Sequence, residues 1–458
     1  MSAPTDRPAS YTMSIVIVGA LFFIFGFVTW LNGTLIPFLK LACDLHSDAQ
    51  ALLVTFAFYM AYFFLAIPSS FILEKTGFKN GMSLGLATMA LGAVIFIPAA
   101  IGRTFSLFLT GLFVQGMGLS LLQTASNPYI SAIGSLESAA SRISIMGICN
   151  KVAGAISPLI LGAIVLKGAS EIEGKIQAAT DVQQRTALLQ ELSQRVIVPY
   201  AIMALILFLL AIMIRYSALP EIEGTVEVHQ KDAGKTSIFQ FPHLLLGALC
   251  IFLYVGVEVM AGDVISIYGK AIGISLDQAK NFTSYTLWSM VIGYIIGIFA
   301  IPKFIKQQRA LAISAVVGIM FSLMGFLTSG YTSIVFIALL GFANALMWPA
   351  IFPLAIDGLG KFTKIGSAIL IMGIAGGAII PQLYARLATQ WGPQAAFVTI
   401  VTPCYLYILY YGLRGYKTGR EGQGLPDSIF NSDFSVGDNR NTGRGESFYV
   451  NALDGTNV

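Results

Sequence analysis

Charged residues are scarce in this chain. They make up 11% of its 458 residues, whereas hydrophobic residues make up 56% and the mean hydropathy is +0.77. So little charge cannot cover a water-soluble core of ordinary proportions. A nucleic-acid partner is also not expected, because a net charge of +4 is what basic cytoplasmic loops produce. The composition therefore predicts a polytopic membrane protein, surrounded by lipid and expected to be monomeric.

Cysteine and histidine are also rare. The four cysteines are widely separated: Cys43, Cys149, Cys250 and Cys404. Their spacing matches neither a disulfide framework nor a metal site, so we expect small core residues. The three histidines fall in loops or at the edge of an apolar run: His46, His229 and His243. With no metal or nucleophile constellation in sight, a membrane enzyme is the weakest alternative, and no cofactor is expected.

Long apolar runs are what the chain has in abundance. A membrane span needs about 20 apolar residues, and twelve runs qualify. They cover roughly 14–38, 50–73, 82–101, 105–130, 143–167, 196–215, 243–268, 278–302, 310–328, 332–356, 365–389 and 394–415. We therefore predict an all-α membrane protein with twelve transmembrane helices in two six-helix halves. The halves are 1–215 and 243–416, the polar stretch 216–242 is a cytoplasmic linker, and 417–458 is a disordered cytoplasmic tail.

An internal repeat supports the two halves. The tetrapeptide Ile-Met-Gly-Ile occurs at 145–148 and again at 371–374, 226 residues later. Leucine, alanine and proline at 121, 125 and 128 recur 225 residues later in the same order. Two parallel six-helix halves are the architecture of a secondary transporter. The offset of 226 makes Glu258 the counterpart of Asn32, and the offset of 225 makes Trp348 the counterpart of Gln123.

Lysine and arginine in the short loops predict the orientation. With a cytoplasmic N-terminus, the loops on the inner side carry most of the basic residues, which places both termini inside. The loop Glu74–Gly81 then forms a cytoplasmic turn after the second span. Charge pairing there is expected to latch the inward-closed state, and the alternative is a merely solvated turn. The segment 168–195 lies outside, and its helical spacing predicts a surface helix.

Polar residues inside the first-half spans are candidates for substrate contact, because a polar group is costly in hydrocarbon. Gln123 and Asn127 are four residues apart and share a helix face. Amides both donate and accept hydrogen bonds, as a sugar requires. Asn32 and Trp30 in the first span add an amide and an aromatic platform. The alternatives are hydrogen bonding between helices for the amides and plain packing for the tryptophan.

Three charged residues lie at membrane depth. Lys151 follows Asn150 in span five, and Glu258 and Asp263 lie in span seven. Lys151 is too far from the cytoplasmic end to snorkel easily, so we expect it to be paired. A Lys151–Glu258 pair between the two halves is the prediction. Asp263 is expected near the outer end, where simple solvation explains it equally well.

The second half offers fewer polar candidates. Asn344 and Trp348 share a face of span ten. Gln382 in span eleven and Trp288 in span eight complete the expected lining of the central cavity. For each of these four residues, packing explains the position as well as substrate contact does.

Three segments resemble one family closely. They are Gly26-Phe-Val-Thr-Trp-Leu-Asn-Gly33 with Leu35-Ile-Pro37, then Gln123-Thr-Ala-Ser-Asn-Pro-Tyr129, and Arg142-Ile-Ser-Ile-Met-Gly-Ile-Cys-Asn-Lys151. They are similar to bacterial sugar transporters of the fucose/proton symporter family in the major facilitator superfamily, and most similar to its glucose/galactose transporter branch. The resemblance covers about 12–415. It implies a major facilitator fold, an inner-membrane location and uptake of a hexose driven by a cation gradient.

The resemblance also points to cavity residues and shows one departure. It implies Asn32, Gln123, Asn127 and Asn150 in the cavity, but the symporters carry acids where Gly33 and Gln123 stand. Neither residue here can titrate, so Glu258 or Asp263 is expected to serve Na⁺ or H⁺, with Glu258 as the candidate Na⁺ ligand. The predicted function is hexose import by cation symport with alternating access. The alternative is a hexose uniporter.

Overall fold

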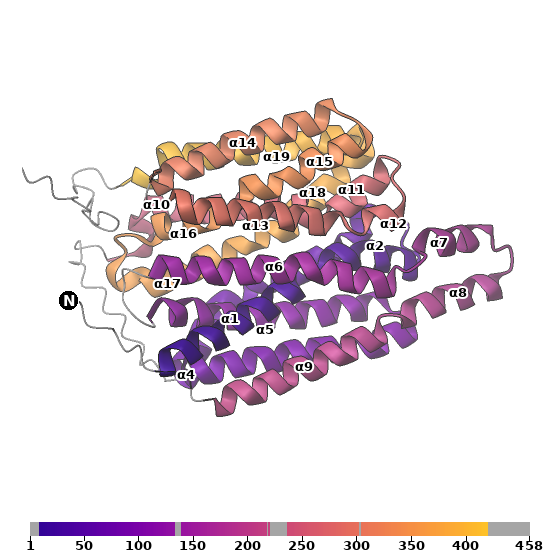
Figure 1. Ribbon diagram of the computed structural model, residues 1–458, viewed down its shortest axis with the longest axis horizontal. Coiled ribbons are helices and arrows are strands. Elements are labelled where there is room, and N and C mark those ends of the chain that lie inside the picture. Colours follow the sequence, from indigo (N-terminus) through magenta and orange to yellow (C-terminus); the bar gives the residue numbers. More distant parts are fainter. Residues whose placement is uncertain (1–8, 133–138, 218, 220–235, 302–303, 420–458) are drawn as a thin grey trace, which may run out of the picture. The chain divides into compact units, whose positions relative to one another are not determined.

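The computed structural model describes residues 9–132, 139–217, 219, 236–301 and 304–419. In these ranges the chain forms helices and connecting turns, with no strand. The long helices run side by side along one common direction (Figure 1). The expected tail 417–458 lies outside the described residues except for its first three, and so does most of the expected linker, 218 and 220–235.

The helices fall into two series. The first series is α1 (Ala9–Thr29), α2 (Asn32–Ala42), α3 (Asp48–Ala51), α4 (Leu53–Gly102), α5 (Phe105–Ala132), α6 (Ala139–Val165), α7 (Ala169–Ala178), α8 (Val182–Gln194) and α9 (Ile197–Tyr216). The second is η2 (Ile238–Gln240), α10 (Pro242–Gly262), α11 (Ile265–Ala271), α12 (Leu276–Ala279), α13 (Phe282–Ala300), α14 (Gln307–Leu327), α15 (Gly330–Asn344), α16 (Met347–Ile356), η3 (Gly360–Phe362), α17 (Thr363–Met372), η4 (Gly373–Ala375), α18 (Gly376–Trp391), α19 (Pro393–Leu413) and η5 (Gly415–Lys417).

Eleven helical segments in the described part are long and apolar enough to cross a membrane. The longest, Asp48–Gly102, has 55 residues, about twice what one crossing needs. It reverses at Gly77, whose φ of 74° and ψ of 169° interrupt α4. A positive φ is easy for glycine and strained for other residues, so this one residue turns the chain. The segment therefore holds two spans, and the predicted twelve helices are confirmed, although the turn expected over Glu74–Gly81 is much shorter.

The packing reproduces the internal repeat at an offset of 226. A side chain at Gly26 of α1 would collide with the backbone of Asn150 in α6, because the carbonyl oxygen lies 1.9 Å from the ideal Cβ position. In the second half, Gly376 of α18 has the same relation to the backbone of Phe252 in α10, at 1.7 Å. Phe252 is 226 residues after Gly26, and Gly376 is 226 after Asn150. The same helix crossing thus occurs twice, with the glycine on opposite partners.

A second crossing, one turn further along, shows the same exchange. The indole of Trp30 lies against Gly154, with Cδ1 2.3 Å from the ideal Cβ position of that glycine. At the equivalent positions, Gly256 lies against Ile380, with Cγ1 at 2.4 Å. The large residue lies on span one in the first half and on span eleven, the equivalent of span five, in the second half. These contacts support the register that pairs Asn32 with Glu258.

The halves differ in where their helices break. The first span is interrupted at Trp30–Leu31 and the seventh at Asp263–Val264, which is seven residues later in the repeat register. Span ten is interrupted at Ala345–Leu346, and span eleven passes through the 3-10 turn η4 at the second copy of the tetrapeptide. The first copy lies in the unbroken helix α6. Broken helices at membrane depth are tolerated where protein or a cavity surrounds them.

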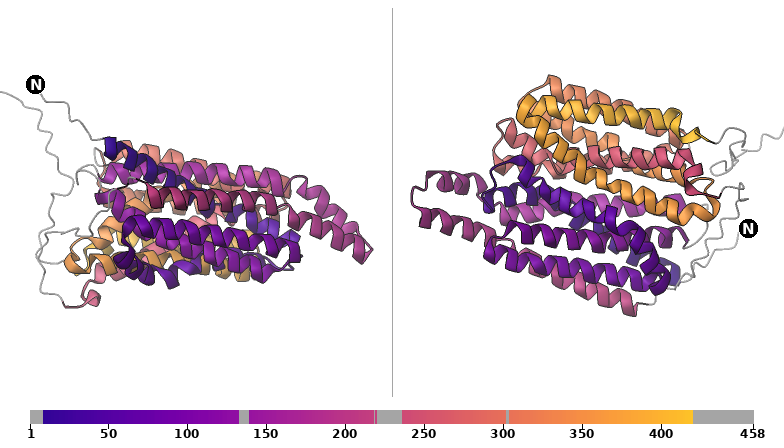
Figure 2. Two further views of the ribbon diagram at one scale, coloured as in Figure 1. Left: turned by 90° about the horizontal axis from the view of Figure 1, so that it is seen from below. Right: turned by 180° about the vertical axis from the view of Figure 1, so that it is seen from behind.

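The segment 168–195 was expected to be one surface helix, and this is wrong in detail. It folds into two short helices, α7 and α8, which form a hairpin. Asp181 caps the start of α8 by accepting hydrogen bonds from the backbone N–H groups of Gln183 and Gln184. The hairpin projects beyond the ends of the other helices (Figures 1 and 2). It is joined to the second half, as described below.

Candidate functional site

Lys151 and Glu258 form the predicted ion pair. Lys151 extends from α6 and Glu258 from α10, and their Nζ and Oε1 atoms are 2.8 Å apart. Both residues are only 8% exposed. In such a place a charge is tolerated only with a partner, because removing one member of a buried pair costs about 3–5 kcal/mol. The pair therefore joins the two halves by a contact that neither half can satisfy alone.

Trp30 lies under this pair. The ammonium of Lys151 is 4.5 Å from the centroid of its ring, which is cation–π geometry. The indole is held between two glycines, Gly154 of α6 and Gly262 of α10, whose ideal Cβ positions lie 2.3 and 2.4 Å from ring atoms. Trp30 is 2% exposed and sits at the break between α1 and α2. Its slot requires that both positions carry no side chain.

Asp263 is buried, so the solvated position near the outer end that the sequence allowed is wrong. The residue is 0% exposed and lies at the break between α10 and α11. Its Oδ2 accepts a hydrogen bond of 3.2 Å from the hydroxyl of Tyr59, which belongs to the second span. A second carboxylate thus lies in the boundary between the halves, one residue from the glycine that holds Trp30.

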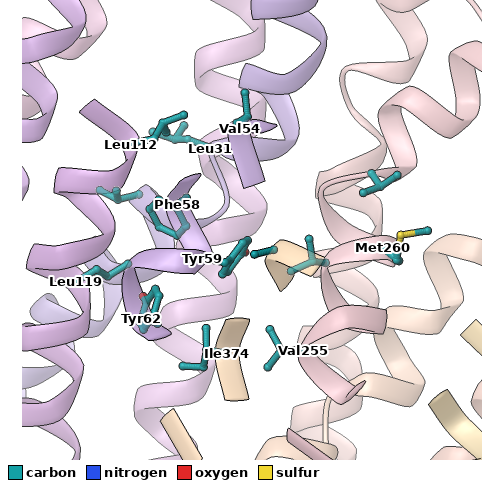
Figure 3. Packing of buried hydrophobic residues seen from close by; sticks show 14 of the residues in the cluster. Leu31, Val54, Phe58, Tyr59, Tyr62, Leu112, Leu119, Val255, Met260 and Ile374 are labelled. Carbon is teal, nitrogen blue, oxygen red and sulfur yellow. The ribbon is translucent and has the colours of Figure 1, made fainter. Parts of the chain in front are cut away.

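Tyrosines link these carboxylates to the amides, and the sequence reading missed them. Tyr59 stacks on Tyr62, with ring centroids 6.5 Å apart, and Tyr62 is hydrogen-bonded to Gln123. Figure 3 shows Tyr59 extending from the second span toward α10, which carries Val255 and Met260. The available signal was the Tyr-x-x-Tyr spacing in span two, which puts two phenols on one helix face. A buried phenol needs a hydrogen-bond partner.

Two of the predicted amides have unused hydrogen-bonding atoms. Asn32 is 1% exposed, and neither its amide oxygen nor its amide nitrogen has a hydrogen-bond partner among the described side chains and backbone. Gln123 is 6% exposed, and its Oε1 has no partner within the described ranges. A buried polar atom without a partner is destabilising, so such atoms commonly mark a place where a ligand or water binds. Asn127 lies in α5, but its side chain is outside the described part of the molecule.

Two other predicted amides serve helix packing. The Nδ2 of Asn150 donates to the backbone oxygen of Phe22 at 3.5 Å, which ties α6 to α1. Asn344, which is fully buried, accepts a 2.8 Å hydrogen bond from the hydroxyl of Tyr405. Its Nδ2 has no partner among the described residues. For Asn150 and Asn344, hydrogen bonding between helices explains most of the arrangement.

The remaining candidates of the second half lie in different places. Trp348 is half-buried at the start of α16, stacked on Phe352 and tilted against Tyr254. Gln382 donates to the backbone oxygen of Ala49 at 3.1 Å, so it joins the halves near α3. Trp288 is 43% exposed on α13, so its expected place in the cavity lining is wrong. Its large apolar ring suits a surface covered by lipid.

Glu258 has aromatic neighbours that the sequence reading also missed. Tyr254 lies one turn earlier in α10 and hydrogen-bonds this carboxylate. Tyr294 of α13 lies against Gly147 of the first tetrapeptide, with Cε1 3.1 Å from the ideal Cβ position. Both tyrosines are buried. Gly147 of the repeated motif thus leaves space for the Tyr294 ring near the charged pair, which is one reason for a glycine at this position.

A separate cavity of about 590 Å³ lies under the α7–α8 hairpin. Its walls carry three ion pairs: Lys40–Asp48, Arg185–Asp44 and Lys270–Glu173. The last pair joins α7 to α11 and so joins the first half to the second. The backbone N–H of Ser170 also donates to Asp277 at 3.3 Å. This end of the boundary between the halves is therefore held by polar contacts at the surface.

Comparisons with known proteins agree with this architecture. The sequence model described as Major Facilitator Superfamily matches residues 18–381. The chain is 34% identical to a glucose/galactose transporter of Brucella abortus, over 91% of this chain and 99% of that protein. It is 27% identical to the L-fucose-proton symporter of Escherichia coli, over 88% and 93% of the two chains. The crystal structure of FucP in the outward conformation superposes with a TM-score of 0.67 at 27% identity, over 88% of this chain and 98% of FucP.

Proposed function

This chain belongs to the major facilitator superfamily and within it to the fucose/proton symporter-like family, and from that premise we propose that it imports a hexose by cation symport. Proteins of this superfamily are transporters and not enzymes. The relatives are described as glucose/galactose transporters and L-fucose-proton symporters, which supports a sugar as substrate. We place the protein in a bacterial inner membrane with both termini in the cytoplasm, as the distribution of basic loop residues predicts.

One observation carries the proposal: the Lys151–Glu258 pair crosses the boundary between the halves on the face of Trp30. A contact of this kind must break or change when one half rocks against the other, as alternating access requires. Asn32, two residues after Trp30, and Gln123, which is hydrogen-bonded to Tyr62 beside Tyr59, retain unused hydrogen-bonding atoms among the described residues. Such amides suit a neutral polyol, because they can both donate hydrogen bonds to its hydroxyls and accept hydrogen bonds from them.

The test is uptake of radiolabelled hexoses by proteoliposomes. The panel contains glucose, galactose, mannose, fucose and N-acetylglucosamine, with Na⁺ replaced by choline in one arm and the pH gradient collapsed in another. Symport predicts accumulation that is lost when its driving ion is removed. Counterflow that is indifferent to both ions identifies a uniporter instead. Absence of saturable uptake for every sugar contradicts the proposal, provided that the protein is shown to be folded and inserted.

A further inference from the structure

Asp263 is a buried carboxylate without a basic partner. It is 0% exposed, and Tyr59 donates to its Oδ2, while Oδ1 has no hydrogen-bond partner in the part of the chain that the structure describes. The charged groups that face it are Glu258 and Lys151. Lys151 is already bonded to Glu258 at 2.8 Å, so that pair is neutral as a unit. Asp263 therefore has no cation of its own among the described residues, and a buried charge without a countercharge is costly.

Other unused oxygen atoms lie beside Asp263, around Gly33. The carboxylate lies next to the backbone N–H of Gly33. From α13, the Oγ1 of Thr283 approaches the same glycine, 2.2 Å from its ideal Cβ position. Thr283 is 0% exposed, and no described residue hydrogen-bonds its hydroxyl. Asn32, the residue before Gly33, has an amide oxygen without a partner as well. The absence of a side chain at Gly33 leaves room for these groups.

The surrounding backbone suits a cation too. Gly33 follows the break between α1 and α2, and Asp263 lies at the break between α10 and α11. A broken helix releases carbonyl oxygens from their hydrogen bonds within the helix, and such oxygens coordinate Na⁺ in other transporter folds. Carboxylate, hydroxyl, amide and carbonyl oxygens are the ligands that hard cations prefer.

We propose that Asp263 and Thr283, together with Asn32, form a Na⁺ site at the junction of the two broken spans. The inference rests on the proposed function, since it assigns the coupling ion of that transporter to Asp263 and not to Glu258. The reason for this assignment is charge: Glu258 is neutralised by Lys151, whereas Asp263 pairs with no basic side chain of its own among the described residues. Several oxygen groups from three separate elements favour Na⁺ over a proton, because a proton binds to a single oxygen whereas Na⁺ is coordinated by several.

The first experiment measures Na⁺ binding without transport. The full chain is purified in detergent, and its thermal unfolding is followed in NaCl and in choline chloride at equal ionic strength. A ligand that binds the folded state raises the unfolding midpoint as its concentration rises. We expect a saturable rise with Na⁺ in the wild type, loss of that rise in Asp263→Asn and a weakened rise in Thr283→Val. The matched controls are Asp181→Asn, at a cap where asparagine serves equally well, and Thr110→Val, on an exposed helix face.

The outcomes separate the site from the sugar function. No Na⁺ effect in the wild type, or an effect that persists in Asp263→Asn, overturns the Na⁺ site, and so does stabilisation by acid alone. If Asp263→Asn does not fold, Asp263→Glu replaces it. The longer side chain moves the carboxylate, and we expect at least a tenfold higher Na⁺ concentration at half-effect. An intact Na⁺ effect without uptake of any hexose removes the sugar function and leaves the site. Hexose uptake that continues in choline removes the site's coupling role and leaves the sugar function.

Discussion

The two halves make the same helix crossings with opposite partners. In the first half the bulky residue at the second crossing is Trp30 on span one, and the glycine is Gly154 on span five. In the second half the glycine is Gly256 on span seven, and the bulky residue is Ile380 on span eleven. The backbone geometry is kept while the chemistry changes. The exchange shows how one half of a duplicated fold can carry a buried tryptophan at a crossing where the other half has an aliphatic residue.

The charged residues follow the same division. Lys151 reaches from the first half to Glu258 of the second. Its repeat counterpart is Gly377, whose ideal Cβ position lies 3.0 Å from the ring of Tyr59, a residue of the first half. One half thus extends a cation across the boundary, and the other makes a gap that receives a ring. Each half therefore supplies a group that packs into, or pairs with, the other half.

The largest effect is expected from breaking the ion pair. Lys151→Met leaves the carboxylate of Glu258 buried without a partner, and Glu258→Gln does the same to the ammonium of Lys151. Breaking a buried pair in this way costs about 3–5 kcal/mol, so initial uptake should fall by roughly a hundredfold or more. The double variant Lys151→Glu with Glu258→Lys restores opposite charges. We expect it to recover part of the uptake in proteoliposomes. Equal loss in the double and single variants would show that the pair does not act as a unit.

The next effect comes from filling the slot of Trp30. Gly154→Ala and Gly262→Ala each place a methyl group on the indole, and overpacking of this kind costs about 1–3 kcal/mol. We expect a lower unfolding temperature and a shifted tryptophan emission. Gly174→Ala is the matched control, because that helical glycine has open space around it. An unchanged emission spectrum in both slot variants would mean that Trp30 is not held as described.

A smaller effect distinguishes the amides of the two halves. Gln123→Ala removes an amide with an unused atom, and losing one hydrogen bond of about 1 kcal/mol should weaken sugar binding by roughly fivefold. Asn344→Ala removes the acceptor of Tyr405, so it should lower stability more than it lowers affinity. Sugar-concentration series and thermal unfolding measure both quantities. The opposite ranking would place the substrate in the second half.

The smallest effect is expected at the hairpin. Lys270 and Glu173 join the halves but are 35% and 22% exposed in their side chains, so the pair is worth about 0.2–1 kcal/mol. Lys270→Met should change uptake less than about fivefold. High salt should reduce uptake by the wild type toward the level of the variant, because exposed pairs are screened. A salt response that is the same in both proteins would remove this pair from the cycle.

Sequence patterns predicted the fold well because a lipid environment leaves few choices. Apolar runs of spanning length must become helices, which fixed the twelve spans, and the repeat predicted the register that the glycine contacts later showed. Lys151 and Glu258 were recognisable because a charge in hydrocarbon needs a partner. The turn at Gly77 was expected to be longer, since polar residues at the end of a helix look like a loop in sequence.

The site was only partly predictable, for a physical reason. Tyr59 and Tyr62 are amphipathic, so they give the same pattern as packing residues until a partner is seen. Trp288 looked like a cavity residue because composition does not say which side of a helix faces lipid. The position of Asp263 depends on where α10 breaks, and the repeat register would place that break seven residues earlier. Helix breaks are set by tertiary contacts, which no single span contains.

The α7–α8 hairpin has a practical meaning for anyone who images this protein. A transporter whose mass lies almost entirely within a detergent belt offers few asymmetric landmarks by which single particles can be aligned. Two short helices that project beyond the bundle break the twofold likeness of the halves (Figure 2). Because Val182 at the start of α8 is 77% exposed, the hairpin also presents an accessible surface against which antibody fragments can be raised. Such a fragment would add mass at a known point on the first half.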